Sequence, residues 1–338
     1  MKKRDAYFDV IRFAAMFMVV FGHVQSATEM SWGAPYIKNF IIGLNMPLFF
    51  IVSGYFALSA VRGGVLWRCL GYLWPAFIVS CGFGVVKICS MKGSMSVTNG
   101  FEWILGMFMS YWFLWCLSVC LILTFFAVNV SKSRMGVMFA ILVIYLLLMF
   151  FPGHTWCIDK VRHMWPYFIF GIFLARIGRL WEVRWLGVIC GLVYLAIVLL
   201  EGDVHSNGMG FYWVDWSISG IRENPYAILL STLRWACGIL GSLALMWVIR
   251  VFCNRFVVIS ERVASLGTTT LGVYVLHQAM LSWTKQYFPD SLMGVIIGTI
   301  LLFGICHGLV ILSKKLKFSN ALIWGFHKTL VKTKMVNR

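Results

Sequence analysis

The chain has 338 residues, of which 61% are hydrophobic and only 12% are charged, and its mean hydropathy is +0.85. Soluble domains carry roughly 25% charged residues, so this composition excludes a large soluble protein and indicates an all-α, polytopic membrane protein of about ten transmembrane helices. The net charge of +17 does not indicate nucleic-acid binding, because the basic residues lie in short loops between apolar spans.

The first predicted span, Ala6–Ala27, holds three titratable side chains in an otherwise apolar segment: Asp9, Arg12 and His23. A basic start followed by an apolar run also has the outline of a cleaved signal peptide. Asp9 and Arg12 interrupt the apolar run, however, and Gln25 makes a poor cleavage signature, so we expect a retained first helix.

The spacing of these residues predicts a polar stripe along the helix. At about 100° per residue, Arg12 and His23 are three turns plus about 20° apart, so both project from nearly the same side, about 16 Å apart along the axis. Asp9 falls within the same stripe. Charges at mid-membrane cost about 2.5–3.5 kcal/mol each on insertion scales and usually face a cavity or a partner. A local Asp9–Arg12 pair near the inner interface and a structurally satisfied His23 are the simpler alternatives.

Nine further spans follow from the apolar runs, and the sixth span overall is short and can extend beyond these bounds. They are Asn39–Leu58, Val65–Ser90, Tyr111–Val130, Met135–Phe151, Met164–Ile177, Trp185–Glu201, Tyr226–Val251, Val263–Tyr287 and Leu292–Ser313. A helix along the membrane surface is expected over residues 101–110. No second soluble domain is evident, so the chain is treated as a single domain over residues 1–338.

The distribution of basic residues predicts that both termini are cytoplasmic. With ten spans and an inner N-terminus, 20 Lys and Arg residues lie on the inner side and seven lie in outer loops, among them Lys160 and Arg162. Lys and Arg bias short loops toward the cytoplasm, so this split supports the layout. Residues 202–225, rich in Gly and Trp, are expected to cover an outward-facing cavity, and the basic tail from Lys314 to anchor at the anionic inner leaflet.

Polar residues recur in the second and third spans. NMPLFFIVSGY (45–55) sets Ser53 and Tyr55 into an apolar run, with Gly54 suited to close helix packing. LWRCLGYLWP (66–75) places Arg68 and Tyr72 one turn apart at the inner end of the third span. That pair suits an anionic group arriving from the cytoplasm, with a positive-inside marker as the simpler explanation.

The ninth span carries a second histidine at a depth similar to that of His23. In SLGTTTLGVYVLHQ (265–278), Tyr274 and His277 are one turn apart. Two histidines at comparable depth on different spans predict a shared cavity better than either one alone. His307 in the tenth span is nearer the inner side and is interpreted as structural.

Together these stretches resemble the acyltransferase-3 family of integral membrane acyltransferases. The family signature of an Arg, ten residues and a His is matched by Arg12 and His23. Further matches, in the family's order, are FDVIRF (8–13), MPLFFIVSGYF (46–56), the stretch from Arg68 to Pro75, YWFL (111–114), YFIFGIFLAR (167–176) and LGVYVLH (271–277). R-x10-H alone is a weak pattern, but with the SGY and YVLH segments it is fairly specific.

The resemblance implies ten core helices in a bacterial cytoplasmic (inner) membrane and transfer of an acyl group, commonly acetyl, from cytoplasmic acyl-CoA. The acceptor is typically a hydroxyl of a cell-envelope glycan or of a lipid-linked sugar, and the donor is a substrate rather than a permanently bound cofactor. The family's essential pair carries over onto Arg12 and His23. Asn45 departs from the His or bulky residue often seen there, and no SGNH-type esterase domain is expected. No metal site is expected, because the ten cysteines lack ligand spacing.

A mechanism follows from joining the polar stripe to the resemblance. The donor phosphates would dock at Arg68 and Tyr72, and His23 would act as general base on the acceptor hydroxyl, with a transient acyl-histidine as the alternative. Arg12 would contact the donor or hold the cavity of His23 electrostatically, and Asp9 would orient Arg12. The residues expected to position the acceptor or to stabilise the oxyanion are His277, Tyr274 and Ser53, with Tyr55 and Trp112 also in the acceptor site.

Two other functions compete with this one. A transporter or flippase would also use intramembrane Arg, Asp and His residues, but residues 1–170 and 171–338 show no convincing correspondence as two repeated halves. A non-catalytic scaffold would need no histidine at position 23. The identity of the acyl group, the acceptor and the oligomeric state do not follow from the sequence, since succinyl or another short acyl group fits as well as acetyl.

Overall fold

In the computed structural model of the chain, helices account for the regular structure of every described part, namely residues 5–27, 34–90, 97–131, 133–151, 158–201, 217–224, 226–284 and 291–325. Among these residues, six helices are long and apolar enough to cross a membrane, and three shorter apolar helices accompany them. The prediction of an all-α, polytopic membrane bundle is therefore confirmed.

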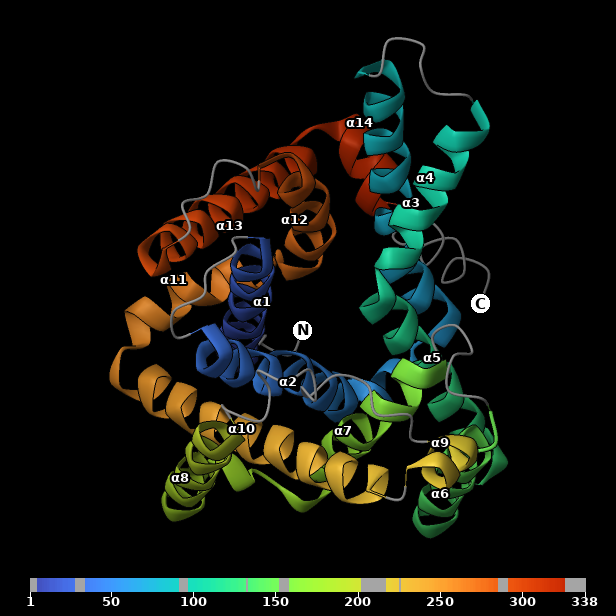
Figure 1. The fold of residues 1–338 in the computed structure, drawn as a ribbon, viewed down its shortest axis with the longest axis vertical. Helices are drawn as coiled ribbons and strands as arrows, with labels where there is room; N and C mark the ends of the chain where they lie inside the picture. Colours follow the sequence, from blue (N-terminus) through green and yellow to red (C-terminus); the bar gives the residue numbers. More distant parts are fainter. Residues whose placement is uncertain are drawn as a thin grey trace.

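Helix α1 (Ala6–Ala27) stands near the centre of the bundle, and the others surround it (Figure 1). Helices α2 (Ala34–Arg62) and α7 (Ile158–Ile177) pack against each other beside it. The chain then places α10 (Ala227–Arg255), α11 (Val257–Gly267), α12 (Thr270–Thr284) and α13 (Leu292–Lys315) along one side of α1. Helices α3 (Val65–Ser90), α4 (Val97–Ser110) and α5 (Trp112–Val130) form the other side.

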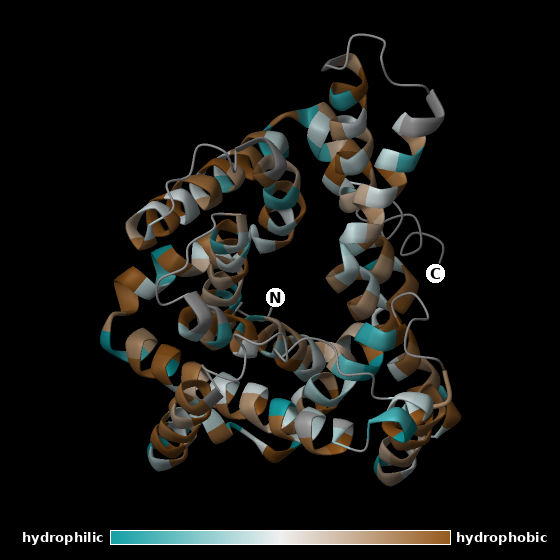
Figure 2. Ribbon diagram, in the orientation of Figure 1, coloured by the Kyte–Doolittle hydropathy of each residue, from teal (hydrophilic) through white to brown (hydrophobic). Residues whose placement is uncertain are grey.

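The remaining elements lie at the periphery. Helix α6 (Arg134–Leu148) packs on α5, and α8 (Arg184–Glu201) packs on α10. Short elements complete the described chain: η1 (Leu180–Glu182), α9 (Ile218–Glu223), α14 (Lys317–Ser319) and the π-helical η4 (Asn320–Gly325). Figure 2 shows that hydrophobic residues dominate the outer helices such as α8 and α13, as expected for surfaces that face lipid.

Two glycines set the crossing of α2 and α7. A Cβ atom on Gly54 would overlap the carbonyl oxygen of Phe168, and one on Gly171 would overlap the carbonyl oxygen of Ile51. Helices in a membrane approach this closely only where small residues face each other. The contact therefore fixes the position of α2 next to Ser53, the residue that precedes Gly54.

A third glycine joins α11 to α1. A Cβ atom on Gly267 would overlap the backbone carbonyl of Asp9, so the end of α11 lies directly against the start of α1. The chain then turns at Thr268 and Thr269 before α12 begins. The sequence prediction of one continuous span over Val263–Tyr287 was wrong here, because this turn divides it into α11 and α12.

Other bounds differ in smaller ways. The predicted surface helix over residues 101–110 belongs to α4, and the predicted span Met164–Ile177 extends back to Ile158. Arg162, which the charge count placed in an outer loop, lies inside α7 and is almost fully buried. Its guanidinium donates to the carbonyl oxygens of Leu148 and Phe151 at 3.2 and 2.7 Å. These hydrogen bonds, at and just beyond the end of α6, offset part of the free-energy cost of burying the charge.

Two of the predicted segments lie largely outside the described residues. Of the Gly- and Trp-rich segment 202–225, only 217–224 is described, and it forms α9 with one residue on either side. Of the basic tail, residues up to 325 are described. There, the Trp324 indole donates to the Ser313 hydroxyl at 3.0 Å and the Trp74 indole donates to the Leu322 carbonyl at 2.7 Å. The first part of the tail therefore packs against α13 and α3.

Candidate active site

Asp9 and Arg12 form an ion pair on the first turns of α1. The Arg12 guanidinium donates to the Asp9 carboxylate at 2.8 Å. The Asp9 side chain is nearly fully buried, whereas a third of the Arg12 side chain is exposed. The guanidinium carbon of Arg12 also lies 5.6 Å from the centre of the Phe56 ring. The local pair that the sequence suggested therefore forms, and it directs Arg12 out of the α1 surface.

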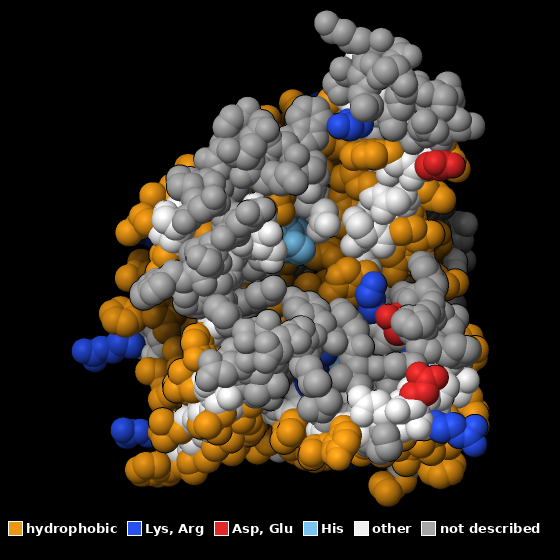
Figure 3. Space-filling model, viewed as in Figure 1, with side chains coloured by type: hydrophobic (Ala, Val, Ile, Leu, Met, Phe, Trp, Pro, Cys, Tyr) orange, Lys and Arg blue, Asp and Glu red, His pale blue; other side chains and the backbone are white. Residues whose placement is uncertain are grey.

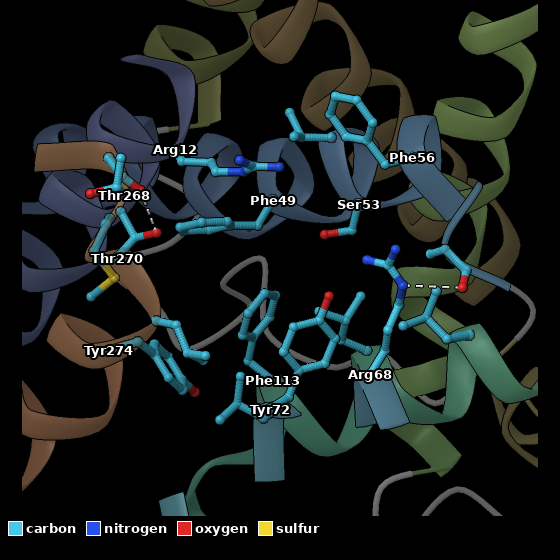
Figure 4. Close-up of a pocket in the computed structure, with 18 of the residues that line it drawn as sticks. Arg12, Phe49, Ser53, Phe56, Arg68, Tyr72, Phe113, Thr268, Thr270 and Tyr274 are labelled. Atoms are coloured by element: carbon cyan, nitrogen blue, oxygen red, sulfur yellow. Dashed lines mark hydrogen bonds between the residues drawn. The ribbon is translucent and has the colours of Figure 1, made fainter. Parts of the chain in front are cut away.

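Arg12 opens onto a cavity of about 440 Å³, here called the Arg12 cavity. Side chains from α1, α2, α3, α5 and α12, with the turn before α12, line it. Figure 4 shows the guanidinium groups of Arg12 and Arg68 and the Ser53 hydroxyl directed into this space. Its lining polar side chains are Arg12, Ser53, Ser59, Arg68, Tyr72, Thr268, Thr270 and Tyr274, and its aromatic ones include Phe49, Phe56 and Phe113.

The electrostatics of the Arg12 cavity favour an anionic ligand. Two guanidinium groups line it, and no carboxylate does among the residues that line it in the described part of the chain. The Nε of Arg68 donates to the carbonyl oxygen of Ala60 at 3.1 Å, which anchors the side chain and leaves its terminal nitrogens toward the cavity (Figure 4). Guanidinium groups in fixed positions suit bidentate recognition of phosphate or carboxylate.

His23 lines a second, smaller cavity of about 190 Å³, here called the His23 cavity. Helices α1, α2, α5, α7 and α10 contribute its walls. The described lining consists of Val19, Gly22, His23, Ser26, Ile42, Asn45, Met46, Trp112, Met164 and Arg234. The ammonium group of Lys160 lies 5.7 Å from the centre of the Trp112 ring. Figure 3 shows a hollow on this face of the molecule in which a histidine side chain is visible.

His277 lies between the two cavities without lining either one. It is fully buried, and its ring centre is 5.2 Å from that of His23 and 5.6 Å from that of Tyr274. Tyr274 lines the Arg12 cavity and His23 lines the other. A continuous row of three rings therefore joins the two cavities.

The hydrogen bonds of His277 define its tautomer. Its Nδ1 lies 3.1 Å from the carbonyl oxygen of Val273 and 2.7 Å from that of Tyr274. Carbonyl oxygens only accept, so Nδ1 carries a hydrogen. The Nε2 atom has no hydrogen-bond partner among the described residues and can accept one.

The structure brings most of the predicted site residues to these cavities. Arg12, Ser53, Arg68, Tyr72 and Tyr274 line the Arg12 cavity. His23 and Trp112 line the His23 cavity. Asp9 contacts the lining residue Arg12, and His277 contacts two lining residues, His23 and Tyr274.

Tyr55 is placed differently from the other predicted residues. Its ring packs 4.9 Å from that of Phe8, 5.1 Å from that of Phe56 and 5.6 Å from that of Trp181. It lines neither cavity and instead packs against Phe56. Phe56 lines the Arg12 cavity, and its ring lies beside the Arg12 guanidinium.

Several residues that line these cavities were not predicted as site residues from the sequence. Thr268 and Thr270 reach the Arg12 cavity because the close approach at Gly267 holds their turn against α1. A run of three threonines in an apolar stretch is the signal that marks them. Arg234 reaches the His23 cavity from α10, and its charge within a predicted span was the corresponding signal.

The described residues contain no group of three or more His, Cys, Asp and Glu side chains able to hold a metal ion. A family model described as an acyltransferase domain matches residues 5–312, which include both cavities and every residue named above as lining them. No curated protein and no solved structure matches the chain significantly.

Proposed function

The chain belongs to the acyltransferase-3 family, and from this premise we propose that it moves an acyl group, by default acetyl, from cytoplasmic acyl-CoA to a hydroxyl of a cell-envelope glycan or lipid-linked sugar. It is a multi-pass membrane acyltransferase. We place it in the bacterial cytoplasmic membrane with both termini inside, in keeping with the excess of Lys and Arg in the predicted inner segments.

One observation supports this function most directly: a cationic cavity and a histidine cavity meet at a row of three rings. Arg12 lies near the start of α1 and His23 near its end, so the cavities lie toward opposite ends of the same helix. An enzyme that takes its donor from one side of a membrane and its acceptor from the other needs this arrangement. The wall between the cavities is where the two substrates would meet.

The Arg12 cavity is the proposed donor site. Its volume of about 440 Å³ lies within the range of roughly 300–1,000 Å³ typical of small-molecule sites. The guanidinium groups of Arg12 and Arg68 would bind phosphate groups of the donor, and the neutral arm that carries the thioester would extend along the aromatic wall. Phe49 and Phe113, whose ring centres are 5.3 Å apart, form part of that wall.

His23 is the proposed general base. Neutral imidazole accepts a proton near pH 7 and contributes typically 10²–10⁴-fold to a rate. As His23 takes the proton of the acceptor hydroxyl, the hydroxyl oxygen bonds to the thioester carbon. The carbon–sulfur bond then breaks, and the leaving thiolate takes up the proton held by His23, which gives free coenzyme A and returns His23 to its neutral form.

His277 is proposed to position His23. Because Nδ1 of His277 is held by two carbonyl oxygens, its Nε2 presents a lone pair. A hydrogen bond to that lone pair from one ring nitrogen of His23 would fix the tautomer of His23 and leave its other nitrogen as the base. Hydroxyl groups of Tyr274 and Ser53 are the proposed donors to the oxyanion.

A transfer assay tests the proposed function. Membranes that contain the chain, incubated with radiolabelled acetyl-CoA and envelope material, are expected to acquire label on a glycan or lipid-linked sugar. Membranes that carry the His23→Ala variant at equal abundance are expected to acquire almost none. Movement of a substrate across the membrane without acyl transfer would instead support a transporter and would overturn the proposal.

A further inference from the structure

A third cavity of about 650 Å³ lies between α8 and α10, away from the two cavities described above. Its lining shares no residue with theirs and consists of Glu182, Arg184, Val188, Trp247, Arg250, Val251 and Asn254. Figure 1 shows α8 on the outside of the bundle, beside α10. This groove, called here the α8–α10 groove, therefore opens at the surface of the protein that meets lipid.

The groove carries more positive than negative charge. Glu182 accepts from Arg250 at 2.9 Å and from Arg179 at 3.0 Å, so a single carboxylate serves two guanidinium groups. Arg184 pairs with no carboxylate among the described residues, and its guanidinium lies 5.9 Å from the centre of the Trp185 ring. Because Arg184 is the first residue of α8, the helix dipole adds to the positive potential.

The groove also has an apolar part. Val188, Trp247 and Val251 are its apolar lining residues in the described part of the chain. The surface continues along α8 with Ile189 and Leu192, which are 56% and 64% exposed. Figure 2 shows the same helix as largely hydrophobic. A ligand that fits has an anionic head and long apolar chains.

We propose that the α8–α10 groove binds a membrane lipid with an anionic phosphate headgroup. The phosphate lies at Arg184 and Arg250 with Asn254 as a further donor, and the acyl chains run along the exposed face of α8. Guanidinium groups bind phosphate bidentately, and basic pockets between membrane helices are suited to anionic lipids. Trp185, the exposed residue that follows Arg184 in α8, is of the aromatic type that is enriched among headgroups at membrane interfaces.

A lipid in this groove also bears on α1. The guanidinium of Arg250 lies 5.6 Å from the centre of the Tyr7 ring, and the Tyr7 hydroxyl donates to the Met246 carbonyl oxygen at 2.9 Å. Tyr7 is two residues before Asp9, which orients Arg12. Anionic lipid is therefore expected to raise the thermal stability of the purified protein, whereas zwitterionic lipid is not.

Lipid retention measured on the intact protein tests the proposal. The full chain is purified in detergent with equal amounts of phosphatidylglycerol and phosphatidylcholine of identical acyl chains, and the retained lipid is counted by native mass spectrometry. Arg184→Gln is expected to lower retention of phosphatidylglycerol about fivefold, the effect of one Arg beside an anionic headgroup. Arg134→Gln is the matched control, because Arg134 is likewise the exposed first residue of a helix, α6, but lines none of the cavities described.

The outcomes separate lipid from other phosphates. Glycerol 3-phosphate and coenzyme A carry phosphate groups but no lipid tails. They are therefore expected to displace little of the retained phosphatidylglycerol. Displacement by either at the concentration of the lipid would overturn the proposal, as would equal retention of the two lipids or equal loss in Arg184→Gln and Arg134→Gln. None of these measurements depends on acyl transfer, so the test stands whether or not the proposed function holds.

Discussion

The imidazole rings of His23 and His277 lie 5.2 Å apart, centre to centre, with their planes tilted by 54°. The two histidines are on α1 and α12, and they differ in access. His23 lines a cavity, whereas His277 is fully buried and has its Nδ1 bound to backbone carbonyls. One ring of the pair therefore faces a cavity and the other is enclosed, and we propose that the enclosed ring positions the other.

His23→Ala is expected to lower the rate of acyl transfer by about 10²–10⁴-fold, because it removes the proposed general base. The rate is measured with labelled acetyl-CoA in membranes that contain equal amounts of each variant. His307→Ala is the control, since His307 lies on α13, lines neither site cavity and bonds Thr269 at 2.8 Å. A His23→Ala enzyme with near-normal transfer, or an equal loss in His307→Ala, would show that His23 is not the base.

His277→Ala is expected to lower kcat by about 10–100-fold if the proposed positioning of His23 matters as much as the partners that orient metal-binding histidines do. The KM for acyl-CoA is expected to change little, because His277 lines neither cavity. Steady-state kinetics at varied donor concentration separate the two parameters. A rise in donor KM with unchanged kcat would contradict a positioning role and would place His277 at the donor instead.

Arg68→Gln is expected to raise the KM for acyl-CoA about tenfold or more, because hydrogen bonds to charged groups contribute about 1.5–3 kcal/mol. Arg62→Gln provides a matched control, since Arg62 is an exposed arginine at the end of α2 and lines neither site cavity. The measurement is initial rate against donor concentration. An unchanged KM in Arg68→Gln would mean that the donor phosphates bind elsewhere.

The part of the site that lies on one helix could be predicted from the sequence. The stripe of Asp9, Arg12 and His23 depends only on helical periodicity, and the structure keeps it within a single helix with the bounds expected. Arg68 and Tyr72 were likewise placed by a one-turn spacing within α3, and both line the Arg12 cavity. Local spacing determines such pairs, and distant parts of the chain do not alter them.

The parts that depend on distant contacts could not be predicted. Tyr55 follows Ser53 and Gly54 in sequence, yet the ring of Trp181 from a remote segment draws it into an aromatic cluster. The burial of Arg162 depends on carbonyl oxygens at the end of α6, which no spacing within α7 reveals.

The break between α11 and α12 has a local signal in the sequence, the threonines after Gly267. The prediction of one apolar span over Val263–Tyr287 did not take it into account. Thr268 and Thr269 donate their hydroxyls to carbonyl oxygens three residues earlier, at 2.7 and 2.8 Å. Side-chain bonds of this kind compete with the helix and allow it to end. A run of threonines beside Gly267 therefore marks a turn even where the surrounding residues suit a continuous span.

The crossing of α2 and α7 gives a prediction about stability that also reaches the site. Gly54→Ala and Gly171→Ala are each expected to destabilise the protein by about 3 kcal/mol, the upper end of the usual cost of overpacking, because the added methyl group meets a backbone carbonyl that cannot rotate away. Gly82→Ala is the control, since a Cβ atom at Gly82 meets nothing within 4 Å. Thermal unfolding of the purified proteins in one detergent measures the difference.

The same variants separate a packing role from a catalytic one. Because Gly54 is next to Ser53 and α2 also contributes Phe49 and Phe56 to the Arg12 cavity, a displaced α2 is expected to weaken donor binding as well. The donor KM is therefore expected to rise in Gly54→Ala below its unfolding temperature and to stay unchanged in Gly82→Ala. If Gly54→Ala unfolded at the same temperature as Gly82→Ala, the close crossing of α2 and α7 would be wrong, and with it the position of Ser53 in the cavity.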